Sequence, residues 1–136
     1  MVGMVLVTHG DVAACMLNSA AMIIGDLKGI QGVGFQEKDS VEDLMERIRS
    51  AVDEVDTGEG ALILVDLFGG TPFNASARML SDAPAGKFEV ITGMNLPMLL
   101  EAVTQRSGKD VEGLAAIAEE AGKSGVRLLT AELEFG

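Results

Sequence analysis

The sequence predicts an α/β fold in which a mainly parallel, doubly wound sheet carries helices on both faces. The first observation is that short apolar runs alternate four times with segments of helical periodicity. The second is that the most apolar run, 61–65, has no polar position, as is typical of a strand covered on both faces. Repeats of this kind join parallel strands through right-handed crossovers. We expect the strand order 2-1-3-4, with an additional C-terminal edge strand.

The first strand and helix lie at the amino terminus. Residues 2–7 include three Val and one Leu, and the run is too short for a helix. Apolar residues then recur at helical spacing as far as Ile24, and Gly25 stands where a C-terminal cap belongs. Cys15 lies within this helix and is expected to be a small core residue.

The second repeat contains the clearest helix. A strand is expected at 30–35, although two glycines weaken its apolar pattern. Ser40 and Asp43 resemble a capping box, which indicates where the helix begins. The apolar residues that follow keep a 3.6-residue period: Val41, Leu44, Met45, Ile48, Val52 and Val55.

The third strand, 61–65, leads into a glycine-rich loop and another helix. Thr71 is expected to be the N-cap of this helix and Pro72 its first residue, because the N–H that proline lacks is unused at that position. The helix is expected to end near Leu80.

The rest of the chain completes the pattern. A fourth strand is expected at 88–92, and two helices have their apolar stripes at 99–103 and 111–121. A final strand is expected at 126–135, where apolar side chains alternate from Leu129 to Phe135, which predicts an edge strand with one exposed side.

Composition limits the classes of function. A chain of 136 residues, 48% of them hydrophobic, is expected to form one domain spanning 1–136. Its net charge is -11 and it has no Trp or Tyr, so nucleic-acid binding is not expected. One His and one Cys cannot build a structural zinc site, and we expect neither metal nor cofactor. The single Cys and the absence of a signal sequence or long apolar run predict a cytoplasmic protein.

The candidate chemistry lies where the strand order reverses, because ligands gather there beyond the carboxyl ends of parallel strands. His9 follows the first strand and Asp66 follows the third. An imidazole at this point can attack a phosphoryl group. A carboxylate on its other ring nitrogen would fix the tautomer and stabilise the developing positive charge. From these residues alone, a structural, hydrogen-bonding histidine explains the pattern about equally well.

Four residues are candidates for binding the phosphoryl group. Gly69, Gly70 and Thr71 lead into a helix N-terminus, where free N–H groups and the positive end of the helix dipole attract anions. The hydroxyls of Thr71 and Thr8 could donate hydrogen bonds to the transferred oxygens. Taken separately, the glycines are explained more simply by a tight turn.

Apolar residues around the same crevice are candidates for docking protein partners. They are Leu67, Phe68, Met94, Leu96 and Met98. Partners that must reach the same histidine would have to use overlapping surfaces.

Three segments together are distinctive. They are Thr8-His9-Gly10 after the first strand, the sequence LVDLFGGTPFN at 64–74, and the sequence GMNLPML at 93–99. In content and order they resemble the signatures of the mannose-type enzyme IIA domains of the bacterial phosphoenolpyruvate-dependent sugar phosphotransferase system. The likeness extends from residue 2 to about residue 130.

The resemblance implies a phosphocarrier. His9 would accept a phosphoryl group from the phosphohistidine of HPr and pass it to a histidine of enzyme IIB, which works with the membrane components IIC and IID. Asp66 would be the carboxylate that holds the histidine, and the backbone around Gly70 and Thr71 would hold the phosphoryl group.

The resemblance also bears on assembly. The family forms homodimers that exchange a C-terminal strand, and the one-sided segment 126–135 fits such an exchange. Many members continue into a IIB domain, whereas this sequence ends at Gly136. We therefore expect IIB on a separate chain, or the sequence to be part of a longer protein.

Three alternatives remain. The histidine could serve a dihydroxyacetone kinase as its phosphotransfer subunit, or belong to a regulatory domain that reports its phosphorylation state. The loop at 68–74 favours the sugar system, since it has the mannose-type form. The third alternative is a flavodoxin-like module for a small ligand, but a chain without Trp or Tyr offers little to stack on a flavin ring.

Overall fold

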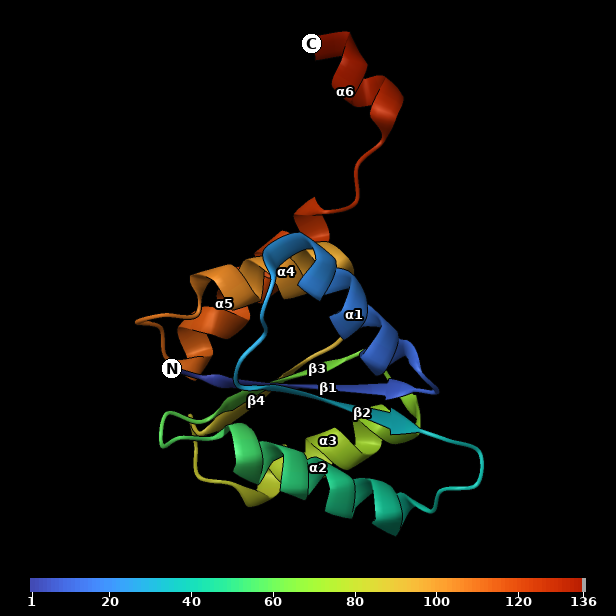
Figure 1. The fold of residues 1–136 in the computed structure, drawn as a ribbon, viewed down its shortest axis with the longest axis vertical. Helices are drawn as coiled ribbons and strands as arrows, with labels where there is room; N and C mark the ends of the chain where they lie inside the picture. The colour runs from blue at the N-terminus through green and yellow to red at the C-terminus, as the bar shows by residue number, and fades with distance from the viewer. Residues whose placement is uncertain (136) are drawn as a thin grey trace.

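The computed structural model describes residues 1–135, in which four strands and six helices form (Figure 1). The strands are β1 (Gly3–His9), β2 (Ile30–Phe35), β3 (Ala61–Val65) and β4 (Phe88–Ile91). The helices are α1 (Val12–Ile24), α2 (Val41–Val55), α3 (Gly70–Asp82), α4 (Leu96–Gln105), α5 (Val111–Ser124) and α6 (Leu129–Phe135). Within residues 1–135, no helix combines the length and the hydropathy needed to cross a membrane.

The four strands form one parallel sheet in the predicted order, β2-β1-β3-β4. β1 and β3 lie in the middle, where Val7 pairs with Val65, and His9 pairs with Phe35 of β2. Helices α1, α4 and α5 cover one face of the sheet, and α2 and α3 cover the other (Figure 1). Because all the strands run in one direction, the loops after their carboxyl ends meet at one edge of the sheet.

Side chains of the two central strands alternate between two cores. Leu6 and Leu64 belong to the core beneath α1, α4 and α5, whereas Val7 and Val65 belong to the core beneath α2 and α3. All four are completely buried. Burial of each such side chain stabilises the fold by about 1.5–3 kcal/mol. Coverage of both faces explains why the third strand has no polar residue.

The predicted capping box at the start of α2 is confirmed. The Ser40 hydroxyl accepts a hydrogen bond from the Asp43 N–H at 3.0 Å, and the Asp43 carboxylate accepts one from the Ser40 N–H at 3.3 Å. The bounds predicted for the strands at 30–35 and 61–65 are also confirmed.

Helix α3 begins earlier than the sequence predicts. Gly69 is its N-cap and Gly70 its first residue, so the prediction that Thr71 and Pro72 hold these positions is wrong. The two glycines have φ values of +89° and +82°, in the region that favours glycine. The turn into the helix is therefore made by the glycine pair, and Thr71 lies inside the first helical turn.

Cys15 is exposed on α1, so the prediction that it is a core residue is wrong. The residues of α1 that are buried against the sheet are Ala13 and Ala20. Cys15 lies on a different side of the helix from these two.

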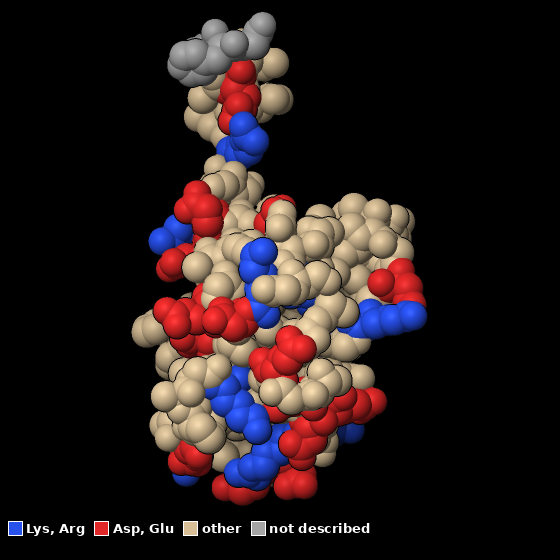
Figure 2. Space-filling model, turned by 90° about the vertical axis from the view of Figure 1, so that its left-hand side faces the viewer, with Lys and Arg blue, Asp and Glu red and all other residues tan. Residues whose placement is uncertain are grey.

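The prediction of a strand at 126–135 is also wrong, because residues 129–135 form the short helix α6. Leu129 and Leu133 fit the alternation of a strand, but they are also four residues apart, as on one face of a helix. The Glu132 N–H donates to the Leu128 carbonyl, and the Glu132 carboxylate pairs with Arg127 at 2.7 Å. The helix projects away from the sheet, so no strand edge lies beside it (Figures 1 and 2).

Candidate functional site

Two neighbouring strands bring His9 and Asp66 together at the carboxyl edge of the sheet. His9 is the last residue of β1, and Asp66 directly follows β3. The Nδ1 atom of His9 lies 3.0 Å from Oδ2 of Asp66, and the His9 backbone N–H donates to the same oxygen at 2.9 Å. The His9 side chain is 47% exposed and that of Asp66 is 18% exposed. The imidazole is thus held at one nitrogen and open to solvent.

The hydrogen bond to Asp66 decides which ring nitrogen is free. An ionised carboxylate can only accept a hydrogen bond, so in the neutral ring the proton sits on Nδ1. Nε2 then carries an unshared electron pair. The second oxygen of the carboxylate, Oδ1, is buried and has no hydrogen-bond partner among the described residues. Among the described residues, the hydrogen bonds of the Asp66 carboxylate are therefore made through Oδ2, to the ring and the backbone N–H of His9.

The start of α3 lies beside the free ring nitrogen. A Cβ atom on Gly70 would be 3.5 Å from both Nε2 and Cε1 of His9, so the backbone of this residue runs against the ring. Gly69 precedes it as the N-cap, and Thr71 follows it as a half-buried residue of the first turn. The first turn of a helix presents unpaired N–H groups and the positive end of the dipole. An anion on Nε2 would meet this helix terminus.

Thr8 lies apart from the open face of the imidazole. The residue is completely buried, and its hydroxyl accepts a hydrogen bond from the Ala13 N–H at 2.9 Å. Its side chain therefore stabilises the start of α1, and a hydroxyl in this position does not reach the solvent-exposed side of His9.

The residues predicted to dock partners divide into two groups. Leu67 and Phe68 are 59% and 76% exposed, and Leu96 is half-buried. Met94 and Met98 are only 8% and 3% exposed and belong to the core that contains Leu99, so their prediction as docking residues is wrong. Sequence spacing placed all five near the crevice, but the direction of a side chain depends on packing that spacing does not show.

A second side of the site was not predicted. The residues that follow β2 lie beside His9, and together with Gly10 and Phe35 they line an open hollow of about 810 Å³. The residues of this loop are Gln36, Glu37 and Lys38. The rule that located Asp66, that loops gather at the carboxyl ends of parallel strands, also applies to β2, which pairs with β1. Within residues 1–135, no cluster of three His, Cys, Asp or Glu side chains could hold a metal ion.

Comparison with known proteins points to one family. Residues 3–119 match the family model described as PTS system fructose IIA component. The chain is 36% identical over 132 residues to the PTS system mannose-specific EIIAB component of Escherichia coli K12. That match covers 96% of this chain and 40% of the relative, so the chain spans less than half of that protein's length.

Two shorter proteins match over most of their length. The PTS system sorbose-specific EIIA component of Lacticaseibacillus casei is 34% identical over 112 residues, covering 82% of this chain and 79% of the relative. The crystal structure of phosphotransferase system component EIIA from Streptococcus agalactiae superposes with a TM-score of 0.89 at 29% identity, covering 96% of this chain and 99% of that one.

The fold and the site define a doubly wound, parallel α/β protein with a carboxylate-held histidine where the strand order reverses. The chain belongs to the family of PTS system fructose IIA components, because the family model matches most of its length and relatives above 30% identity share that length. The resemblance to mannose-type enzyme IIA domains, which rested on three short segments, is thereby confirmed.

Proposed function

We propose that the chain is a phosphocarrier, in which His9 accepts a phosphoryl group from phosphorylated HPr and passes it to enzyme IIB. The observation that carries this proposal is the contact of Nδ1 with Asp66, which leaves Nε2 free beside the N-terminus of α3. Membership of the IIA family supports this choice of donor and acceptor, because the family resemblance implies work with HPr and IIB.

Transfer then follows from the geometry. The electron pair on Nε2 attacks the phosphorus of the donor phosphohistidine, a new N–P bond forms on His9, and the old N–P bond returns its electron pair to the donor ring. Asp66 continues to accept the Nδ1 proton and stabilises the positive charge that the His9 ring gains. The same exchange, with IIB as the acceptor, discharges His9.

The loop at the start of α3 would hold the phosphoryl group. The N–H groups around Gly69, Gly70 and Thr71 would donate to its oxygens, and the helix dipole would favour its negative charge. Donors of this kind can neutralise phosphoryl charge in place of a cation.

Partner proteins would dock on the apolar surface beside His9. Leu67 and Phe68 extend into solvent there, and the Phe68 ring packs 4.7 Å from that of Phe73, which restricts its movement. Leu96 is the first residue of α4 and is half-buried. HPr and IIB must both reach Nε2, so we propose that they bind overlapping surfaces in turn. A carrier that works with these two partners would act in the cytoplasm and reach the membrane only through IIC and IID.

We further propose that the chain forms a homodimer through its C-terminal segment. Val126, Leu128, Leu129 and Leu133 are all more than two-thirds exposed in the single chain. Apolar side chains gathered in this way usually mark a contact with another protein surface. β4 is an outer strand of the sheet and so offers an edge to which a segment from a second copy could bind.

The proposed function is tested by phosphorylation of the purified chain with phosphoenolpyruvate, enzyme I and HPr. We expect one acid-labile phosphoryl group per chain, and none on His9→Ala, because His9 is the only histidine. Cys15→Ala is a matched control, since it removes an exposed thiol and should label like the wild type. Full labelling of His9→Ala would refute the assignment.

A further inference from the structure

The turn that directly follows His9 is held by the end of β2. The Gly10 N–H donates to the Phe35 carbonyl at 2.8 Å. A Cβ atom on Gly34 would lie 2.2 Å from the Gly10 carbonyl oxygen, so glycine is required for this close approach. The two segments are therefore in direct backbone contact immediately beyond His9.

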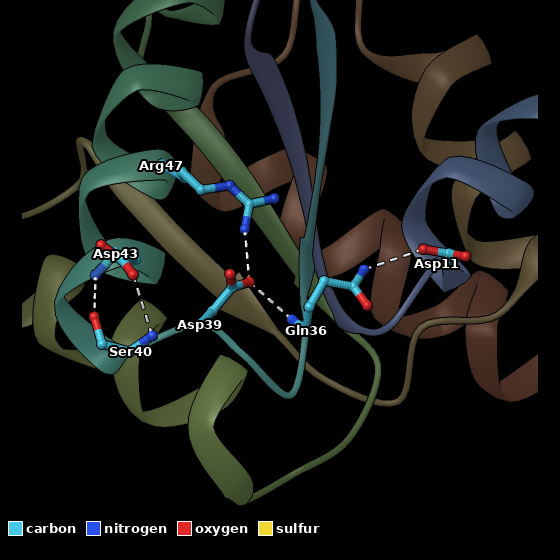
Figure 3. A network of polar contacts seen from close by, with 6 residues as sticks. All are labelled: Asp11, Gln36, Asp39, Ser40, Asp43 and Arg47. Atoms are coloured by element: carbon cyan, nitrogen blue, oxygen red, sulfur yellow. Dashed lines mark hydrogen bonds and ion pairs between the residues drawn. The ribbon is translucent and has the colours of Figure 1, made fainter.

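A side-chain contact continues from this backbone contact. Asp11 occupies the N-cap position of α1, where a carboxylate usually accepts a hydrogen bond from its own helix, but it makes no such bond. Thr8 has taken the available Ala13 N–H instead. The Asp11 carboxylate accepts a hydrogen bond from the Gln36 side-chain amide at 3.1 Å, and the two side chains point toward each other in Figure 3.

Gln36 is itself fixed from the opposite side. Its backbone N–H donates to Oδ2 of Asp39 at 2.9 Å, and the same oxygen accepts a hydrogen bond from Arg47 of α2 at 3.1 Å (Figure 3). The Asp39 side chain is only 14% exposed. The loop from β2 to α2 is thus tied to a helix that packs on the sheet, and it presents the Gln36 amide to the turn after His9.

We propose that Gln36 is a positioning residue for His9, acting through Asp11. Asp66 holds the imidazole from the β3 side, and Gln36 holds the turn that follows it from the β2 side. The same contact also fixes the direction of the Asp11 carboxylate, two residues from His9, because it turns that side chain toward Gln36.

The chain offers a matched control for removal of the Gln36 amide. Gln105 at the end of α4 also donates from its side-chain amide to a carboxylate, that of Glu101, at the same distance of 3.1 Å. It lies at the opposite edge of the sheet, because its neighbour Arg106 donates to the Val2 and Gly29 carbonyls at the amino ends of β1 and β2. Gln105→Ala therefore removes the same kind of bond away from His9.

The first measurement is the ¹⁵N spectrum of the imidazole, which is unambiguous because the chain has one histidine. In the wild type we expect the proton on Nδ1 and a bare Nε2. In Gln36→Ala we expect the ¹⁵N chemical shifts of the two ring nitrogens to move closer to each other, because the ring then samples both tautomers. The spectrum of Gln105→Ala should match that of the wild type. A ring spectrum of Gln36→Ala identical to that of Gln105→Ala would overturn the proposal.

The second measurement exchanges the carboxylate of Asp11 and the amide of Gln36, and so separates an effect on the position of His9 from a loss of stability. The variant that combines Asp11→Asn with Gln36→Glu keeps one amide donor and one carboxylate acceptor, so it should restore the wild-type spectrum. Gln36→Glu alone puts two carboxylates together and should perturb the ring more than Gln36→Ala. No restoration by the combined variant, at a thermal stability equal to the wild type, would also overturn the proposal.

The rate of transfer from HPr is the third measurement, and it alone rests on the proposed function. Loss of one amide–carboxylate hydrogen bond should slow labelling of Gln36→Ala about threefold to tenfold relative to Gln105→Ala. Equal rates in these two variants would count against positioning. A wild type that takes no label would refute the phosphocarrier role, while the ring spectra would still decide whether Gln36 positions His9.

Discussion

At the scale of single residues, the Asp66 carboxylate holds His9 at both its ring and its backbone. The carboxylate accepts two hydrogen bonds from the same residue, one from the ring and one from the backbone, through one oxygen. Its other oxygen is buried without a partner among the described residues. On the proposed function, this carboxylate would stabilise the positive charge that the His9 ring gains when Nε2 accepts the phosphoryl group.

We expect Asp66→Asn to slow phosphorylation of His9 while leaving the fold intact. The amide oxygen can still accept from Nδ1, but it is neutral, and hydrogen bonds to charged groups are the stronger by about 1–2 kcal/mol. The rate should fall about tenfold, as followed by the time course of labelling from phosphorylated HPr. Asp53→Asn, a change of the same charge on the exposed side of α2, is the control. Equal rates for these two variants would show that Asp66 only shapes the turn.

The site residues that could be predicted from the sequence are those that the strand order alone brings together. His9 and Asp66 follow two adjacent parallel strands, and the register of β1 with β3 brings them together whatever the side chains elsewhere do. Thr8, Met94 and Met98 lie equally near in the sequence pattern, yet their side chains point into the interior. Whether a side chain near a strand end faces solvent or core depends on packing, which a single sequence does not reveal.

At the scale of elements, the start of α3 depends on two consecutive glycines. Thr71 and Pro72 form a familiar local signal for a helix start, but the chain must turn sharply from β3 into α3, and Gly69 and Gly70 make that turn with positive φ. The Thr71-Pro72 signal for a helix start thus competes with the geometry of the turn from β3, and the turn determines where α3 begins. It also places the Gly70 backbone beside Nε2.

We predict that Gly70→Ala impairs both stability and transfer. An alanine at φ +82° costs about 1–2 kcal/mol, and its methyl group would contact the His9 ring at the nitrogen that must be free. Gly86→Ala, at the same φ of +82° but with no atom within 4 Å of the added Cβ, is the matched control. Both variants should lose similar thermal stability, and only Gly70→Ala should lose labelling rate. A similar loss of rate in both would locate the effect in the backbone rather than beside the histidine.

The C-terminal segment shows where periodicity fails at this scale. Residues 129–135 alternate in polarity, but a strand also needs a neighbour, and in the single chain this segment lies apart from the sheet (Figure 1). Leu, Ala and Glu favour helix when no strand edge is available, and the Arg127–Glu132 pair lies at the start of α6. The sequence pattern could not distinguish a strand from a helix at 129–135, because a strand forms only where a neighbouring strand is available to pair with it.

At the scale of the whole molecule, the parallel sheet concentrates function at one edge. His9 at the end of β1, the loop after β2 and Asp66 after β3 all lie at this edge, beside the start of α3. The opposite edge, which faces the viewer in Figure 2, carries Lys and Arg scattered among Asp and Glu. The strand order was predictable because alternating elements leave few topologies for a chain of this length.

The most direct test of the central claim is to find which atom carries the phosphoryl group. The claim is that Asp66 holds Nδ1 and leaves Nε2 of His9 to react. The chain should be labelled with ¹⁵N, phosphorylated by HPr, and examined by ³¹P and ¹⁵N spectroscopy at alkaline pH, where phosphohistidine is preserved. We predict a phosphorus atom bonded to Nε2 and a proton retained on Nδ1. Phosphate on Nδ1, or on any residue other than His9, would contradict the account.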